Sequence, residues 1–126
     1  MRNTLALLVA LLPLASCSLF EDRDRIVIMG IEDIEVPEQA EAYQAFDVAF
    51  SGTLGNGCQQ FEKLEMVRSE HRAQFTMLAR QPDGGCTDDI REVRWRGQLI
   101  VERTGPFVLD FRQGRGASVQ REVVIR

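Results

Sequence analysis

The sequence has a single histidine, His71, and this scarcity limits the chemistry that the chain can support. A nucleophilic triad needs a base beside its nucleophile, so any histidine-dependent triad must use this residue. His71 lies in the segment Ser-Glu-His-Arg between two apolar runs, which is typical of an exposed hairpin tip. Such a tip offers no buried environment that tunes an imidazole, so we expect His71 to be a solvated turn residue.

The chain also lacks a phosphate-binding loop and a long apolar run. Gly114-Arg115-Gly116 has none of the strand-to-helix context that a phosphate loop needs. A membrane-spanning helix needs about 20 apolar residues. Residues 3–20 carry no charge, but the strongly apolar stretch covers only residues 5–12, and Pro13 follows it. These features favour a cleaved leader over a membrane-spanning anchor.

The amino terminus has the layout of a secretory signal. Arg2 gives a positive start, residues 5–12 form an apolar core, and the small residues Ala15 and Ser16 follow. We therefore expect residues 1–16 to be a signal helix that is removed. An uncleaved anchor or an ordinary secreted protein is the alternative.

The end of this leader, Leu14-Ala15-Ser16-Cys17, resembles the bacterial lipobox, in which small residues precede a cysteine. The resemblance implies that the Cys17 thiol carries diacylglycerol and that its freed amine is acylated. Two or more acyl chains anchor a protein stably, at about 0.8 kcal/mol per buried CH₂. Among the lipoproteins that it resembles, Asp after the cysteine favours the inner membrane. Ser18 stands here, so we expect the outer membrane, on its periplasmic face or its surface.

The expected mature chain is acidic and long enough for one domain. Removing residues 1–16 leaves 110 residues with 14 basic and 19 acidic side chains, a net charge of −5. Acidic residues predominate in residues 17–90 and basic ones in residues 91–126. An acidic exported domain is not expected to bind nucleic acid, and no motif indicates a small-molecule cofactor.

With Cys17 assigned to lipid, Cys58 and Cys86 remain as an even pair in an oxidising compartment, which predicts a disulfide. Closing a loop of about 29 residues would stabilise the fold by roughly 3–4 kcal/mol. A free-thiol pair or a metal site is the alternative. A metal would need further ligands, and His71 does not lie at a ligand spacing.

Apolar and polar residues alternate along most of the chain after residue 24. Phe46, Val48 and Phe50 give one example, and Phe107, Leu109 and Phe111 another. This alternation predicts half-buried strands, at about residues 25–36, 45–54, 61–69, 73–80, 91–102, 106–112 and 118–125. A brief helical turn is expected within residues 36–43.

About seven short strands in one domain predict an all-β fold, a single immunoglobulin-like antiparallel β-sandwich over residues 25–126. A small β-barrel is the alternative. Residues 17–24 are expected to be a lipidated tether. The chain also resembles uncharacterised immunoglobulin-like domains of small bacterial lipoproteins, through Val36-Pro37-Glu38, Phe46-Asp47-Val48, Asn56-Gly57-Cys58 and Cys86. This resemblance implies the sandwich and the disulfide and brings no activity.

Acidic residues supply the remaining candidates for chemistry. Asp83, Asp88 and Asp89 are candidates for a weak Ca²⁺ site, although their spacing matches no EF-hand loop. Carboxylate pairs could support hydrolysis. Asp88 and Asp89 are a poor couple, because neighbours on a strand face opposite sides. The cluster Glu32, Asp33 and Glu35 is the other candidate.

The row with Arg94 and Arg96 is the candidate binding face. It could meet an acidic partner, lipid phosphates or the acidic half of the same domain, and a solvated sheet face is the simpler interpretation. Trp95, the only tryptophan, shares the register of Val93 and Val101, which favours core packing over a ligand anchor.

Together these observations predict a membrane-anchored lipoprotein that is not an enzyme and acts as a protein-binding or structural module of the cell envelope. One alternative is an inhibitor of an envelope hydrolase such as lysozyme. Those inhibitors present a Ser-Gly loop with an aromatic residue, whereas Thr53 and Leu54 follow Ser51-Gly52 here. The other alternative is a carboxylate-dependent hydrolase.

Overall fold

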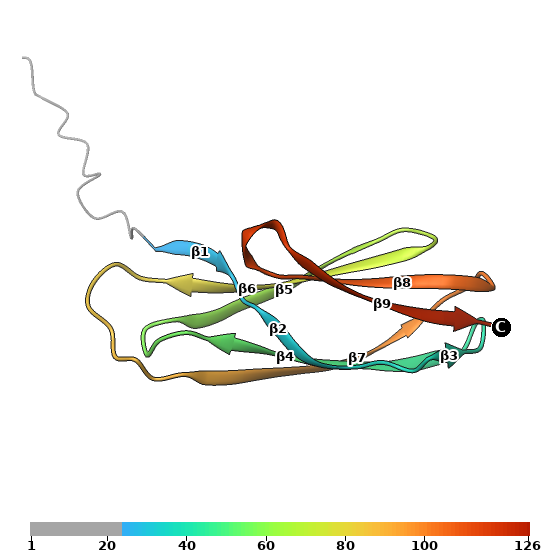
Figure 1. The fold of residues 1–126 in the computed structure, drawn as a ribbon, viewed down its shortest axis with the longest axis horizontal. Helices are drawn as coiled ribbons and strands as arrows, with labels where there is room; N and C mark the ends of the chain where they lie inside the picture. Colours follow the sequence, from blue (N-terminus) through green and yellow to red (C-terminus); the bar gives the residue numbers. More distant parts are fainter. Residues whose placement is uncertain (1–23) are drawn as a thin grey trace, which may run out of the picture.

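The computed structural model describes residues 24–126, which form an elongated sandwich of two β-sheets (Figure 1). The expected leader and the Cys17 lipidation site lie outside these residues. In chain order the strands are β1 (Arg25–Ile28), β2 (Ile31–Glu35), β3 (Gln39–Ala40), β4 (Ala45–Leu54), β5 (Gln60–Arg68), β6 (Arg72–Gln81), β7 (Arg91–Ile100), β8 (Gly105–Arg112) and β9 (Ser118–Ile125). The predicted all-β sandwich is confirmed.

One sheet has three strands and the other has six; we call them the small and the large sheet. The small sheet has the order β2-β4-β7. In the large sheet, β6 pairs with β5 on one edge, and with β1 and β8 on the other. Beyond β8 lie β9 and β3. The two sheets are separate layers (Figure 1), so the alternative of a small closed barrel is wrong.

Two strand pairs are parallel, where the sequence led us to expect antiparallel neighbours throughout. β6 pairs with β8 from Arg72↔Val108 to Phe75↔Phe111, and β3 pairs with β9. Alternation of apolar residues indicates which face a side chain occupies, but it does not indicate which strand lies alongside. The sequence therefore could not reveal these pairings.

The described residues contain nine strands rather than about seven, because the first expected strand divides and a short one is added. At Met29 and Gly30 the chain passes from β1 in the large sheet to β2 in the small sheet. The Met29 amide donates a hydrogen bond to the Met77 carbonyl at 2.9 Å and holds this crossing in place. Within residues 36–43 the structure has β3 and a tight turn instead of the expected helical turn.

The core forms where the alternating residues of the two sheets meet. Phe50 of β4, Phe75 of β6 and Phe111 of β8 are fully buried, with ring centroids 5.3 or 5.4 Å apart. Trp95 of β7 is half-buried and lies 5.0 Å from Phe50 and 5.8 Å from Phe75. The expectation that Trp95 packs against the core is confirmed. Burial of each phenylalanine stabilises the fold by about 1.5–3 kcal/mol.

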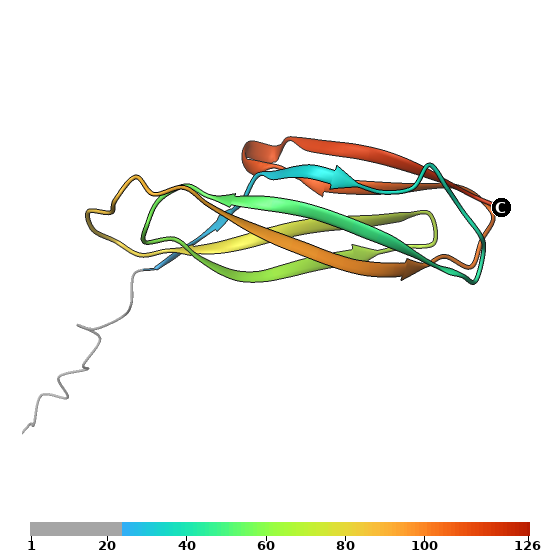
Figure 2. The same ribbon diagram turned by 90° about the horizontal axis from the view of Figure 1, so that it is seen from below.

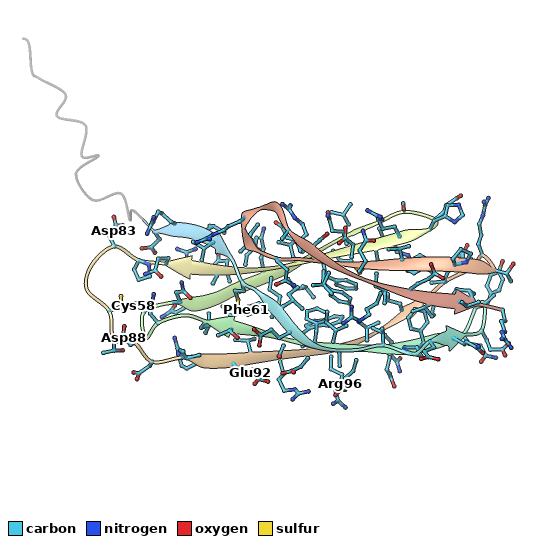
Figure 3. The ribbon with its side chains drawn as sticks, in the orientation of Figure 1. Cys58, Phe61, Asp83, Asp88, Glu92 and Arg96 are labelled. Carbon is cyan, nitrogen blue, oxygen red and sulfur yellow. A yellow bond between two sulfur atoms is a disulfide. The ribbon has the colours of Figure 1, made fainter. Side chains whose placement is uncertain are left out.

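The predicted disulfide is confirmed, because Cys58 and Cys86 are bonded with Cα atoms 5.5 Å apart. It joins the β4–β5 loop to the β6–β7 loop at one end of the sandwich, which we call the disulfide pole (Figure 3). The Gly57 amide donates a hydrogen bond to the Thr87 carbonyl at 2.8 Å. A Cβ atom at Gly57 would lie 2.1 Å from Thr87 Oγ1, so any other residue there would force the Thr87 side chain to shift.

The chain enters and leaves the sandwich at opposite ends. β1 begins at the disulfide pole, where Arg25 pairs with Gln81 at the end of β6. The C-terminus lies at the other end, which we call the distal pole (Figure 1). Residues 24–126 contain no helix with the length and apolar character needed to cross a membrane.

Candidate functional site

The arginine row predicted as a binding face lies on the outer surface of the small sheet. Arg94 is 3.7 Å from Glu92, and both side chains are about half exposed. Arg96 borders a shallow hollow of about 240 Å³, together with Glu35, Asp47 and Ala49. Figure 3 shows the Arg96 and Glu92 side chains pointing away from the sandwich. The register places both arginines opposite small residues of β4, which leaves their guanidinium groups accessible.

The acidic candidates do not gather into a metal site. Asp83, Asp88 and Asp89 are exposed in the β6–β7 loop. Asp89 accepts a hydrogen bond from the Thr87 hydroxyl at 3.0 Å. In the part of the chain that the structure describes, no three acidic, cysteine or histidine side chains lie together as metal ligands would.

His71 lies in the turn between β5 and β6, as predicted, and is exposed. Its backbone carbonyl accepts a hydrogen bond from the Val108 amide at 2.9 Å, which ties the turn to β8. Ser51 and Gly52 lie inside β4 and not in a loop. Ser51 is buried, and its hydroxyl donates to the Glu32 carbonyl at 3.3 Å or to Asp33 at 3.1 Å.

A surface that the sequence analysis missed lies along the side of the sandwich between β5 and β7, which we call the open side. Directly opposite residues of antiparallel strands point to the same face of a sheet. Leu64 faces Met77 and Met66 faces Phe75, and both β6 partners are fully buried in the core. Leu64 and Met66 therefore point toward the interior of the sandwich. Phe61 does the same opposite Ala79.

These inward-pointing residues of β5 are nevertheless exposed. Phe61 is 39% and Met66 is 47% exposed, and Leu64 is only partly buried. The reason is that the small sheet ends at β7, whereas the large sheet continues beyond β6 to β5. No strand among residues 24–126 lies over the inner face of β5. The open side therefore exposes an apolar row of Phe61, Leu64 and Met66.

Two arginine side chains frame the open side by reaching across it. Near the distal pole, Arg68 of β5 donates a hydrogen bond to the Ile100 carbonyl at the end of β7. Near the disulfide pole, Arg91 of β7 donates to the Gln59 carbonyl just before β5. β5 and β7 accordingly run in the same direction along one side of the molecule, as Figure 2 shows.

A charged cluster lies at the disulfide end of β5. Arg80 donates hydrogen bonds to Glu62 at 2.9 and 3.1 Å and lies 3.4 Å from Asp24. The hydrogen bond from Arg80 lowers the pKa of Glu62, and the same contact raises the pKa of Arg80. Asp24 directly precedes β1, so this cluster ties the start of β1 to β5 and β6 of the large sheet.

The strand edges differ in how well they are protected against pairing with another strand. The pairing of β5 with β6 shifts register between Phe61 and Lys63, and β2 is short and shifts register between Glu32 and Glu35. Such irregularities and edge lysines protect a sheet edge. β7 pairs with β4 over ten consecutive residues without a shift, and nothing in residues 24–126 pairs with its other edge. β7 is therefore the long, regular and unpaired edge.

Sequence alternation carried part of the signal for this site. Residues 61–69 were expected to form a strand with one buried face, and the apolar positions Phe61, Leu64 and Met66 are visible in the sequence. Their exposure depends on the unequal widths of the two sheets, which no local pattern reports. The chain matches no known protein family, no curated protein and no solved structure.

Proposed function

We propose that this protein is a bacterial lipoprotein, held on the outer membrane through Cys17, whose β-sandwich binds another protein of the cell envelope without catalysing a reaction. The observation that carries the binding role is the apolar row of Phe61, Leu64 and Met66 on the open side. Contiguous exposed apolar side chains on a small domain are typical of surfaces that contact a partner.

The position of β1 supports the anchored arrangement. The chain enters the domain at the disulfide pole, so a lipid on Cys17 would hold that pole toward the membrane. The open side runs along the length of the sandwich from this pole to the distal one. A partner lying beside the domain, at the same membrane, can therefore reach it.

The lipid anchor is tested by the mass of the mature amino terminus and by the variant Cys17→Ala. We expect a triacylated cysteine at the amino terminus of the native protein and no lipid mass on the variant. The binding role is tested by crosslinking on intact envelopes, with the non-lipidated variant Cys17→Ala as control. A native mature chain without lipid would overturn the anchor. Crosslinking that yields no partner in repeated trials would overturn the binding role.

A further inference from the structure

On the open side, the small sheet ends one strand before the large sheet does, and the place where a further strand would fit is defined on two sides. One boundary is the outer edge of β7, with which no strand of residues 24–126 pairs, so that its backbone groups, apart from the Ile100 carbonyl that Arg68 contacts, can form a further ladder. The other is the inner face of β5, with its exposed Phe61, Leu64 and Met66. A strand added to β7 would supply the missing backbone partner and would cover this apolar row at the same time.

The charge on β7 indicates the chemistry of such a strand. β7 carries Arg91, Arg94 and Arg96 against a single acidic residue, Glu92, in a chain whose overall charge is negative. Arg94 and Arg96 are on the outer face, where a neighbouring strand would place every second side chain beside them. Acidic side chains at those positions would be attracted. A second copy of β7 would instead bring three further arginines to the same edge.

The side chains of the added strand that point inward are expected to be apolar, unlike the acidic ones that point outward. Trp95 points inward on β7, since it faces the buried Phe50, and it is only half-buried. The inward-pointing residues of an added strand would lie beside Trp95 in the small sheet and would face the apolar row of β5 in the large sheet. Burying them is favourable only if they are apolar, at about 25 cal/mol per Å².

We propose that the free edge of β7 binds an extended segment of a partner protein, in which apolar residues alternate with acidic ones, as a fourth strand of the small sheet. This inference rests on the proposed protein-binding function and names its site and its ligand class. At one end of β7, the Ile100 carbonyl already accepts a hydrogen bond from Arg68. At the other end, the Arg91 side chain donates a hydrogen bond to the Gln59 carbonyl. The segment is therefore expected to pair with residues 92–98.

The test uses the intact protein and a synthetic nine-residue peptide that alternates valine with glutamate, beside a peptide that alternates valine with lysine. Trp95 is the only tryptophan in the sequence, so tryptophan emission reports directly on this edge. We expect the glutamate peptide to change the emission and to bind at least tenfold more tightly than the lysine peptide. Equal affinities, or no binding of the glutamate peptide, would overturn the proposal.

Two pairs of variants locate the binding. We expect Arg94→Glu with Arg96→Glu to reverse the preference between the peptides. The control pair Arg121→Glu with Arg126→Glu, which makes the same charge change at exposed positions of β9 and the C-terminus, should leave it unchanged. Met66→Ser should weaken binding of the glutamate peptide, whereas Val67→Ser, on the next and outward-facing residue, should not. If the control pair changed the peptide preference as much as the β7 pair, or if Val67→Ser weakened binding as much as Met66→Ser, the site would be wrong.

Hydrogen exchange gives a readout that does not depend on a substitution. The bound glutamate peptide should slow the exchange of β7 amides. Slowing in β5 or β2 instead, or a dimer through β7 in the absence of peptide, would overturn the assignment. These outcomes are separable from the proposed function. Envelope crosslinks that persist in the Arg94→Glu and Arg96→Glu protein would leave the binding role standing and remove this site.

Discussion

Asp110 is a buried carboxylate on the outer face of β8, and it has only one charged partner among the described residues. It is 4% exposed, and its Oδ2 atom lies 3.4 Å from Nη1 of Arg72, whose side chain is half exposed. The Oδ1 atom is buried and has no hydrogen-bond partner in the described part of the chain. A buried charge with so few partners depends strongly on the one cation beside it.

Removing that cation should therefore destabilise the fold. We expect Arg72→Met to lower the free energy of unfolding by about 1–3 kcal/mol, because the carboxylate loses the one charged partner that it has among residues 24–126. Adding Asp110→Asn should recover most of the loss, since a neutral amide does not need a cation. Urea unfolding of the two single variants and the double variant measures this coupling. A double variant as unstable as Arg72→Met alone would contradict the explanation.

Gly97 allows the indole of Trp95 to lie flat along β7. A Cβ atom at Gly97 would lie 2.4 Å from Cη2 and 2.6 Å from Cζ2 of Trp95, which is too close for any side chain. The indole therefore owes its place beside Phe50 and Phe75 to this glycine.

The variant Gly97→Ala should displace the ring toward the open side. We expect a red shift of the tryptophan emission, together with a loss of about 1–3 kcal/mol in the free energy of unfolding, as for other overpacked sites. Gly85→Ala is the matched control, because a Cβ atom at Gly85 meets no atom within 4 Å. An unchanged emission spectrum in Gly97→Ala would show that the ring can be accommodated without moving.

At the scale of elements, periodicity located six of the nine strands, β4 to β9, to within two residues at each end. β4 and β9 begin and end at the residues that were expected from the alternation of apolar and polar positions in residues 45–54 and 118–125. The expected first strand failed as one element because Gly30 lies where the chain changes sheets, and alternation on both sides of a crossing looks continuous. β3 was missed because two residues are too short to show a period.

For the candidate site as well, the sequence indicates local features but not how distant strands are arranged. Arg94 and Arg96 were identified because they lie on one strand, where local spacing defines a face. The apolar row of β5 is exposed because β7 is the edge of a narrower sheet. Sheet width and strand order depend on pairings between distant residues, so no local window of sequence contains them.

The disulfide joins two loops that precede β5 and β7, the two strands of the open side. Cys58 and Cys86 are 28 positions apart. We expect Cys58→Ala with Cys86→Ala to lower the free energy of unfolding by about 3–4 kcal/mol, because the unfolded chain regains the entropy of the closed loop. Reductant should lower the stability of the native protein toward that of the double variant and leave the variant unaffected. Equal stability of the oxidised and reduced native protein would contradict this.

At the scale of the whole molecule, the proposed anchor and the position of β1 together define an orientation. Seven residues between Cys17 and Arg25 span at most about 25 Å. A ten-residue strand such as β7 adds roughly 33 Å of length to the domain. The disulfide pole should therefore lie nearer the membrane than the distal pole, where Arg103 is located between β7 and β8.

This orientation is testable with the lipidated protein in vesicles that contain brominated lipids. In a Trp95→Phe background, Asp83→Trp places a tryptophan at the disulfide pole and Arg103→Trp places one at the distal pole. We expect stronger quenching at position 83. Equal quenching at both positions, or stronger quenching at position 103, would overturn the orientation while leaving the lipid anchor itself unaffected.

The parallel pair of β3 and β9 joins residues that are 85 positions apart, Gln39 with Val124 and Ala40 with Ile125. Because β9 completes this contact, β3 and the edge of the large sheet cannot pair until residues 118–125 have been synthesised and reach β3. Contacts of such long sequence separation also slow folding. For the exported chain proposed here, this timing is an advantage, since a domain that completes its fold late remains extended while it crosses a membrane.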